Sequence, residues 1–149
     1  MAQESDQEIA ERLTRRRARM LPALAVIFIA GQATYFGDVA QPFRAVDATR
    51  ISAWLAWAVV LLALLATGGG LFRSKKVRAL LNDEVTREHR LRAISFGFWA
   101  AMLACVLTYI FSAFEPMTAR EAIHLVLTLG VGGALLRFGL LERRALKDG

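Results

Sequence analysis

Long apolar segments alternate with short, mostly basic polar connections along most of this chain. The four segments cover residues 20–37, 51–72, 93–114 and 122–141. At 1.5 Å of rise per residue, a helix of about 18 to 22 residues matches a hydrocarbon core about 30 Å thick. Lipid offers no hydrogen-bond partner to exposed backbone groups, so such segments must be helical. The pattern predicts an all-α membrane protein with four transmembrane helices.

The connections are short, so we expect sequential helices to be antiparallel neighbours in an up-down-up-down four-helix bundle. Residues 1–19 are predicted to form a polar N-terminal arm, and residues 20–149 a single transmembrane domain. The arginine run before the first apolar segment also resembles the start of a cleaved secretory signal. Three further spans and basic residues at both ends of the chain favour retention of the first segment.

Composition and charge agree with this class and orient it. Of the residues, 56% are hydrophobic and 21% charged, and the mean hydropathy is +0.40. The net charge is +6, but 16 of the 19 basic residues lie in the N-terminal arm, the central connection and the C-terminal end. By the positive-inside rule, both termini and the central connection face the cytoplasm of a bacterial inner membrane. Basic residues next to membrane ends attract anionic lipid, so we expect no direct nucleic-acid binding.

The connection between the second and third segments is the most informative polar stretch. Asn82 or Asp83 can cap a helix that runs without glycine or proline into the third segment. Asp83 with Arg87 and Glu88 with Arg92 form acid–base pairs at i,i+4 spacing. Because an apolar stripe also continues beyond the second segment, we expect helices two and three to extend into the cytoplasm as a helical hairpin. The alternative is a solvated connector without a partner.

The run Asn82-Asp83-Glu84-Val85-Thr86-Arg87 resembles the signature of uncharacterised small four-span bacterial inner-membrane proteins, which carry Asp-Glu-x-x-Arg before the third helix. Val85 departs from the basic residue or leucine common there. Such proteins are often paired with a small helix-turn-helix regulator. The resemblance implies a non-enzymatic regulator or adaptor that docks a soluble cytoplasmic protein, possessing no catalytic residue and no cofactor. The candidate partner-binding residues are Asp83, Glu84, Arg87, Glu88 and Arg90.

Polar residues at the predicted outer ends of the helices support an alternative function, an accessory or transport subunit of a membrane complex. This outer polar cluster would comprise Gln32, Asp38, Glu115, Arg120, Glu121 and His124. The other interpretation of His124 is a satisfied interfacial histidine. Thr118 and Glu121 match a capping box at the start of the fourth helix. Near the cytoplasmic end, Arg137 can extend to the headgroups or pair with Glu142.

The sequence holds no motif for catalysis, for phosphate binding by a glycine loop or for a metal site, so we expect no enzyme, cofactor or metal. The single cysteine, Cys105, cannot form an internal disulfide, and we expect it to be a small core residue. Small residues in the third and fourth segments predict faces where helices approach closely, within one chain or between copies in a homo-oligomer. These residues are Gly97, Ala100, Ala101, Ala104, Gly130, Gly132 and Gly133.

Overall fold

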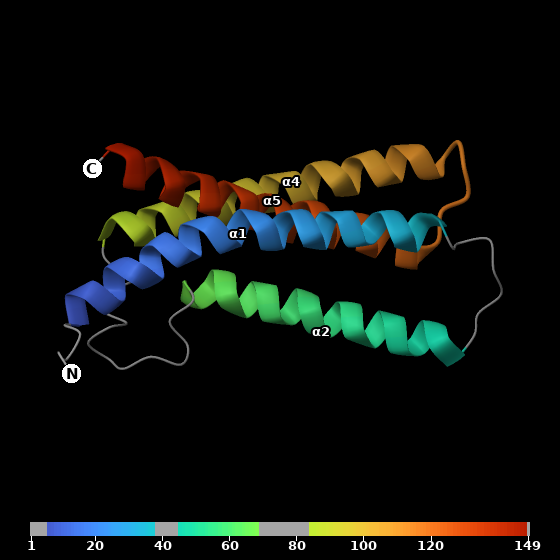
Figure 1. Cartoon of the computed structure of the whole chain (residues 1–149). Coiled ribbons are helices and arrows are strands. Elements are labelled where there is room, and N and C mark those ends of the chain that lie inside the picture. Colours follow the sequence, from blue (N-terminus) through green and yellow to red (C-terminus); the bar gives the residue numbers. More distant parts are fainter. Residues whose placement is uncertain (1–5, 38–44, 69–83, 149) are drawn as a thin grey trace.

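The protein is all-helical over the residues that the computed structural model describes, 6–37, 45–68 and 84–148. The helices are α1 (Asp6–Gly37), α2 (Ala45–Thr67), α4 (Glu84–Ser112) and α5 (Ala119–Asp148). Long helices α1, α4 and α5 lie together, and α2 runs along one edge of the bundle (Figure 1). The predicted all-α class is confirmed.

Three of the helices are long and apolar enough to cross a membrane, over Thr49–Thr67, Glu84–Ser112 and Ala119–Lys147. They expose large apolar side chains that a water-soluble domain would bury, such as Leu103 at 61% exposure. These features indicate a helical membrane protein. The first predicted span, residues 20–37, forms the second half of α1, whose side chains are described only as far as Gly31, and it stays a prediction.

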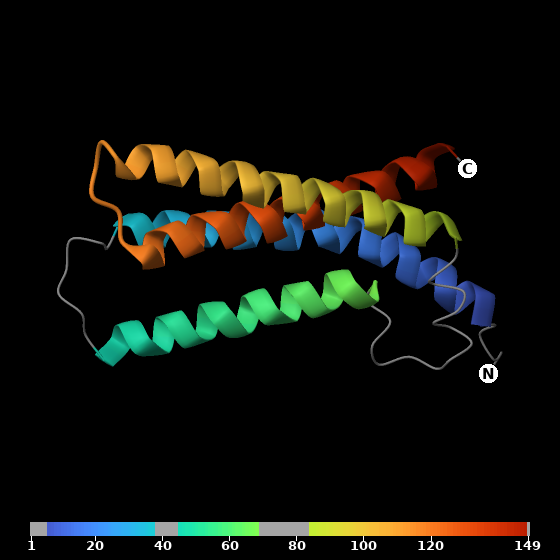
Figure 2. The same ribbon diagram turned by 180° about the vertical axis from the view of Figure 1, so that it is seen from behind.

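Helix α5 is the one against which the others pack, with α4 and α1 in extensive contact and α2 in a smaller one. Gly132 of α5 lies beside Ile29, and Gly139 lies beside Pro22, so α1 and α5 are antiparallel. Seen from behind, α2 again lies at the edge of the bundle, away from α4 (Figure 2). Extensive contact therefore joins α1 to α5 rather than to α2, its neighbour in the sequence.

Small residues bring α4 and α5 close together. A Cβ atom added to Gly97 would lie 2.5 Å from the Gly130 carbonyl oxygen and 2.7 Å from the Ala134 Cβ. In lipid, where apolar burial drives little helix association, such close van der Waals contact is a main stabilising term. The predicted close approach is confirmed within the chain. The core prediction for Cys105 is wrong, because its side chain is exposed while its neighbour Ala104 is buried against the bundle.

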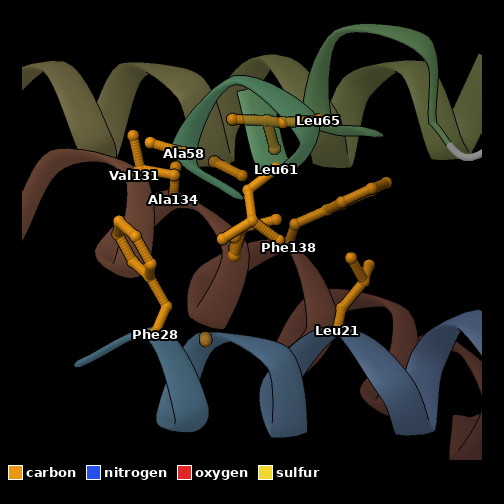
Figure 3. Close-up of a cluster of buried hydrophobic side chains, with 11 residues drawn as sticks. Leu21, Phe28, Ala58, Leu61, Leu65, Val131, Ala134 and Phe138 are labelled. Carbon is orange, nitrogen blue, oxygen red and sulfur yellow. The ribbon is translucent and has the colours of Figure 1, made fainter. Parts of the chain in front are cut away.

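An apolar core joins α1, α2 and α5 (Figure 3). Phe138, Leu21, Leu61 and Leu135 are its largest fully buried side chains. The buried core residues of each helix recur three or four positions apart, so each helix contributes one apolar stripe. The labelled members are Leu21 and Phe28 of α1, Ala58, Leu61 and Leu65 of α2, and Val131, Ala134 and Phe138 of α5.

Pro22 lies inside α1 and has no N–H to donate to the carbonyl of Ala18, four residues earlier. The side chain of Arg143 replaces that donor, because its Nε lies 2.9 Å from the Ala18 oxygen. A second guanidinium nitrogen, Nη2, is 3.4 Å from the Arg19 carbonyl oxygen. Arg143 of α5 thus donates a hydrogen bond to the Ala18 carbonyl oxygen, which the proline leaves without a backbone donor.

The helix ends follow local sequence signals. Helix α2 ends at Thr67, before the predicted residue 72, because Gly68 adopts a left-handed conformation with φ 62°. Helix α4 runs unbroken from Glu84 to Ser112, as predicted. The expected hairpin tip lies in residues 69–83, outside the described part of the chain. At the start of α5, Glu121 accepts hydrogen bonds from the Thr118 backbone nitrogen at 2.7 Å and from its hydroxyl at 2.8 Å, so the capping box is confirmed.

Candidate functional site

A buried ion pair, Arg17 of α1 with Glu142 of α5, lies where parts of all four helices meet. The two side chains are 8% and 3% exposed. We use the term ion-pair cluster for Arg17, Gly68, Thr86, His89 and Glu142.

Arg17 spreads its donors over three neighbours. Its Nε donates to Glu142 Oε2 at 3.1 Å, and Nη2 contacts the same oxygen. Nη1 donates to the carbonyl of Gly68 at 3.1 Å, and Nη2 also lies 3.2 Å from the hydroxyl oxygen of Thr86. The guanidinium carbon is 5.5 Å from the centre of the Phe138 ring, a cation–π contact. One side chain therefore connects α1 with the end of α2, the start of α4 and the end of α5.

Glu142 uses both of its carboxylate oxygens. Oε2 faces Arg17, and Oε1 lies 3.4 Å from Nδ1 of His89. Burying a charged pair costs several kcal/mol of desolvation, and only a geometry that satisfies both partners recovers it. Here Gly68 and Thr86 contact Arg17, and His89 contacts Glu142. The arrangement fixes the relative positions of the helices at this end of the bundle.

The start of α4 projects from this cluster with two different faces. Thr86 and Ala93 are buried, and His89 is partly buried, toward the bundle. Glu84, Arg87 and Glu88 are exposed on the other side. Two large apolar side chains, Val85 at 52% and Leu91 at 56% exposure, lie in the same segment. The outward face of this segment thus combines charged and apolar groups, and the segment precedes residues 93–114, the predicted third span.

The residues predicted to bind a partner differ in their solvent exposure. Glu84, Arg87 and Glu88 are exposed, while Arg90 is only partly exposed. Asp83 lies outside the described residues. The predicted pair of Glu88 with Arg92 is present, with 2.6 Å between Glu88 Oε1 and Arg92 Nη2. We call Glu84, Val85, Arg87, Glu88 and Leu91 the α4 face.

The predicted outer polar cluster is dispersed among different environments. Glu115 and Arg120 are exposed, and Glu121 serves the capping box with Thr118. His124 is 3% exposed and stacks on Trp54 of α2, with 3.9 Å between the ring centres. Asp38 and the side chain of Gln32 lie outside the described residues. His124 therefore contributes to the contact between α2 and α5.

A cavity of about 580 Å³ opens between α4 and α5 at the end of the bundle opposite the ion-pair cluster. Its lining is mostly apolar, and the residues with hydroxyl groups along it include Thr108, Tyr109 and Ser112. Cys105 also lines it. No group of three His, Cys, Asp or Glu side chains able to hold a metal ion occurs among the described residues.

Sequence reasoning missed the ion-pair cluster. Arg17 was one of five arginines assigned to the membrane surface, and Arg137 was considered as a partner for Glu142. The structure instead pairs Glu142 with Arg17 and His89. The sequence does not single out Arg17, because Arg17 shares a helical stripe with Leu21 just as Arg16 shares one with Met20.

No family model, no curated protein and no solved structure matches this chain.

Proposed function

We propose that this protein is a non-enzymatic adaptor of a bacterial inner membrane that docks a soluble cytoplasmic protein through the α4 face. The observation that carries the proposal is the combination of an exposed charged and apolar surface with a buried ion-pair cluster directly behind it. A docking surface held in one geometry loses less entropy on binding than a mobile one. Asp83, next to this face in the sequence, and the partly exposed Arg90 belong to the same proposal.

The orientation behind this proposal is an up-down-up-down bundle with both termini in the cytoplasm. The basis is the excess of basic residues at those ends. The contact between Arg17, near the start of α1, and Glu142, near the end of α5, supports placing both ends on one side. Single cysteines at Ala145 and Glu115, in a chain whose Cys105 is replaced by alanine, test the orientation. An impermeant thiol reagent added outside intact cells should label position 115 and not position 145, and the reverse result contradicts it.

A photo-crosslinking residue at Arg87 tests the docking surface in living cells, with the same residue at Ser112 as the matched control on the other end of α4. We expect a crosslinked soluble protein at position 87 only. Replacing Glu84 and Glu88 with lysine should remove the adduct through charge reversal, whereas Glu115→Lys should not. A DNA-binding regulator, usually basic, would fit these two acids. No adduct at position 87, or one that survives the charge reversal, contradicts the proposal.

The cavity between α4 and α5 favours a second candidate function, an accessory or transport subunit of a membrane complex. Its working surface would lie at the outer end of the bundle, near Thr118 and Glu121. In the same experiment, adducts at Ser112 and none at Arg87 would support this function over the adaptor.

A further inference from the structure

Two arginines from different helices lie together where α1 and α5 leave the predicted membrane core. Arg143 of α5 reaches the backbone of α1, with its Nη2 3.4 Å from the Arg19 carbonyl oxygen. The side chain of Arg19 lies on the same helix and donates from Nε to the Arg15 carbonyl oxygen at 3.5 Å. Both residues are exposed. We call them the Arg19–Arg143 patch.

The charge of this patch is not neutralised by an acid within the described residues. Three other arginines at the same end have carboxylate partners: Arg15 with Glu11, Arg17 with Glu142, and Arg92 with Glu88. Arg19 and Arg143 hydrogen-bond to backbone carbonyls, which satisfy donors but leave each full positive charge in place. Neither guanidinium group therefore has a counter-ion among the described residues, and an anion from outside the chain would supply one.

The position of the patch suggests which anion. Arg19 directly precedes the apolar segment 20–37, and Arg143 follows the segment 122–141 by two residues. The adjacent apolar side chains Met20 and Leu140 are 44% and 40% exposed. A ligand here would contact guanidinium groups at the membrane surface and exposed apolar side chains next to them, toward the membrane core. This is the layout of a phospholipid, with its phosphate at the surface and its acyl chains in the core.

We propose that the Arg19–Arg143 patch binds the phosphate group of an anionic phospholipid of the cytoplasmic leaflet, whose acyl chains lie on Met20 and Leu140. Arginine suits this role because its planar guanidinium group donates two hydrogen bonds to neighbouring phosphate oxygens. Arg16 and Arg144, also exposed, add positive charge from the same two helices. The site is independent of partner docking, which uses the start of α4.

Native mass spectrometry of the full chain in mild detergent, with equal amounts of phosphatidylglycerol and phosphatidylcholine, tests the proposal. We expect the wild type to retain phosphatidylglycerol preferentially. The double variant R19Q/R143Q should lose that preference by roughly thirty-fold, from the usual contribution of two basic residues. The matched control R87Q/R92Q removes two positive charges from α4 at the same end of the bundle. Arg92 is already paired with Glu88, and Arg87 lies between the exposed Glu84 and Glu88, so this variant should keep the preference.

Because R143Q also removes the donor to the Ala18 carbonyl, the same substitutions are repeated with Pro22→Ala, whose new backbone N–H can serve that oxygen. The P22A variant should keep the lipid preference, and P22A/R19Q/R143Q should lose it. Survival of the preference in both arginine-deficient chains, or an equal loss in the control, overturns the proposal. So does full displacement of the lipid by millimolar glycerol phosphate, since the site would then recognise free phosphate.

Discussion

Arg17 and Glu142 are 125 positions apart in the sequence, yet they form an ion pair of which both members are more than nine-tenths buried. The pair joins the beginning of α1 to the end of α5, and Thr86 and the Gly68 carbonyl complete the donors of Arg17. A pair of this kind is worth little compared with apolar side chains of similar volume, but removing one member leaves a buried charge without its partner. Comparing a single with a double substitution therefore measures how much the ion pair contributes to stability.

Glu142→Ala should therefore lower the free energy of unfolding by about 3–5 kcal/mol, because Arg17 loses its carboxylate while buried. Thermal or denaturant unfolding in detergent, followed by circular dichroism, measures this. The control is Glu88→Ala, which removes half of an exposed pair with Arg92 and should cost less than about 1 kcal/mol. The double variant R17M/E142L should recover most of the loss. Equal effects of E142A and E88A would show that the buried pair is not structurally important.

Gly97→Ala should destabilise the contact between α4 and α5. The added methyl group would lie 2.5 Å from the Gly130 carbonyl oxygen, a backbone atom that can yield only if the helices separate. Overpacking of this kind costs about 1–3 kcal/mol. Gly31→Ala is the matched control, because an added Cβ there meets nothing within 4 Å, and alanine favours a helix more than glycine does. A G97A chain as stable as G31A would contradict the close approach.

Two substitutions of Trp54 should change the stability by different amounts. Its indole Nε1 is buried without a hydrogen-bond partner, while its ring stacks on His124 and on Phe28. Trp54→Phe keeps an aromatic ring and removes the unsatisfied N–H, so we expect stability within about 1 kcal/mol of wild type. Trp54→Ala should cost about 3–5 kcal/mol through loss of packing. Unfolding measurements check both, and an equal loss in the two variants would mean that the N–H has a partner.

Pro22 and Arg143 should show an energetic coupling. In the wild-type chain, Arg143→Met removes the donor that replaces the missing N–H of Pro22, and the unsatisfied Ala18 carbonyl should cost about 1–3 kcal/mol. With Pro22→Ala already present, a backbone N–H is available, so the same substitution should cost markedly less. A double-mutant cycle measures the difference. Strict additivity of the two substitutions would argue against the coupling.

Local signals accounted for most of what the sequence predicted correctly. The capping box of Thr118 and Glu121 depends on residues three positions apart, and it forms as expected. The unbroken start of helix α4, from Glu84 to Phe96, follows from a stretch without glycine or proline. The Gly97 contact follows from the need for small side chains where helices meet. These features need no knowledge of how the helices are arranged.

The ion-pair cluster depends on that arrangement, which explains why sequence reasoning missed it. Five arginines precede the first apolar segment, and which of them is buried is decided by the rotation of α1 against α5. An apolar segment that faces lipid on one side and protein on the other has hydrophobic residues all round, so its pattern does not reveal the rotation. For the same reason, the placement of Cys105 on the outside of α4 was not foreseen.

Among the four described helices, α5 packs against the other three and comes last in the chain. During synthesis, α1, α2 and α4 are therefore complete before their main packing partner exists. In the two-stage view of membrane folding, helices insert first and associate afterwards, and here most association would wait for α5. Until α5 is made, Arg17 lacks Glu142, and Gly97 lacks the facing residues Gly130 and Ala134. The contacts of α5 therefore form late in the assembly of the bundle.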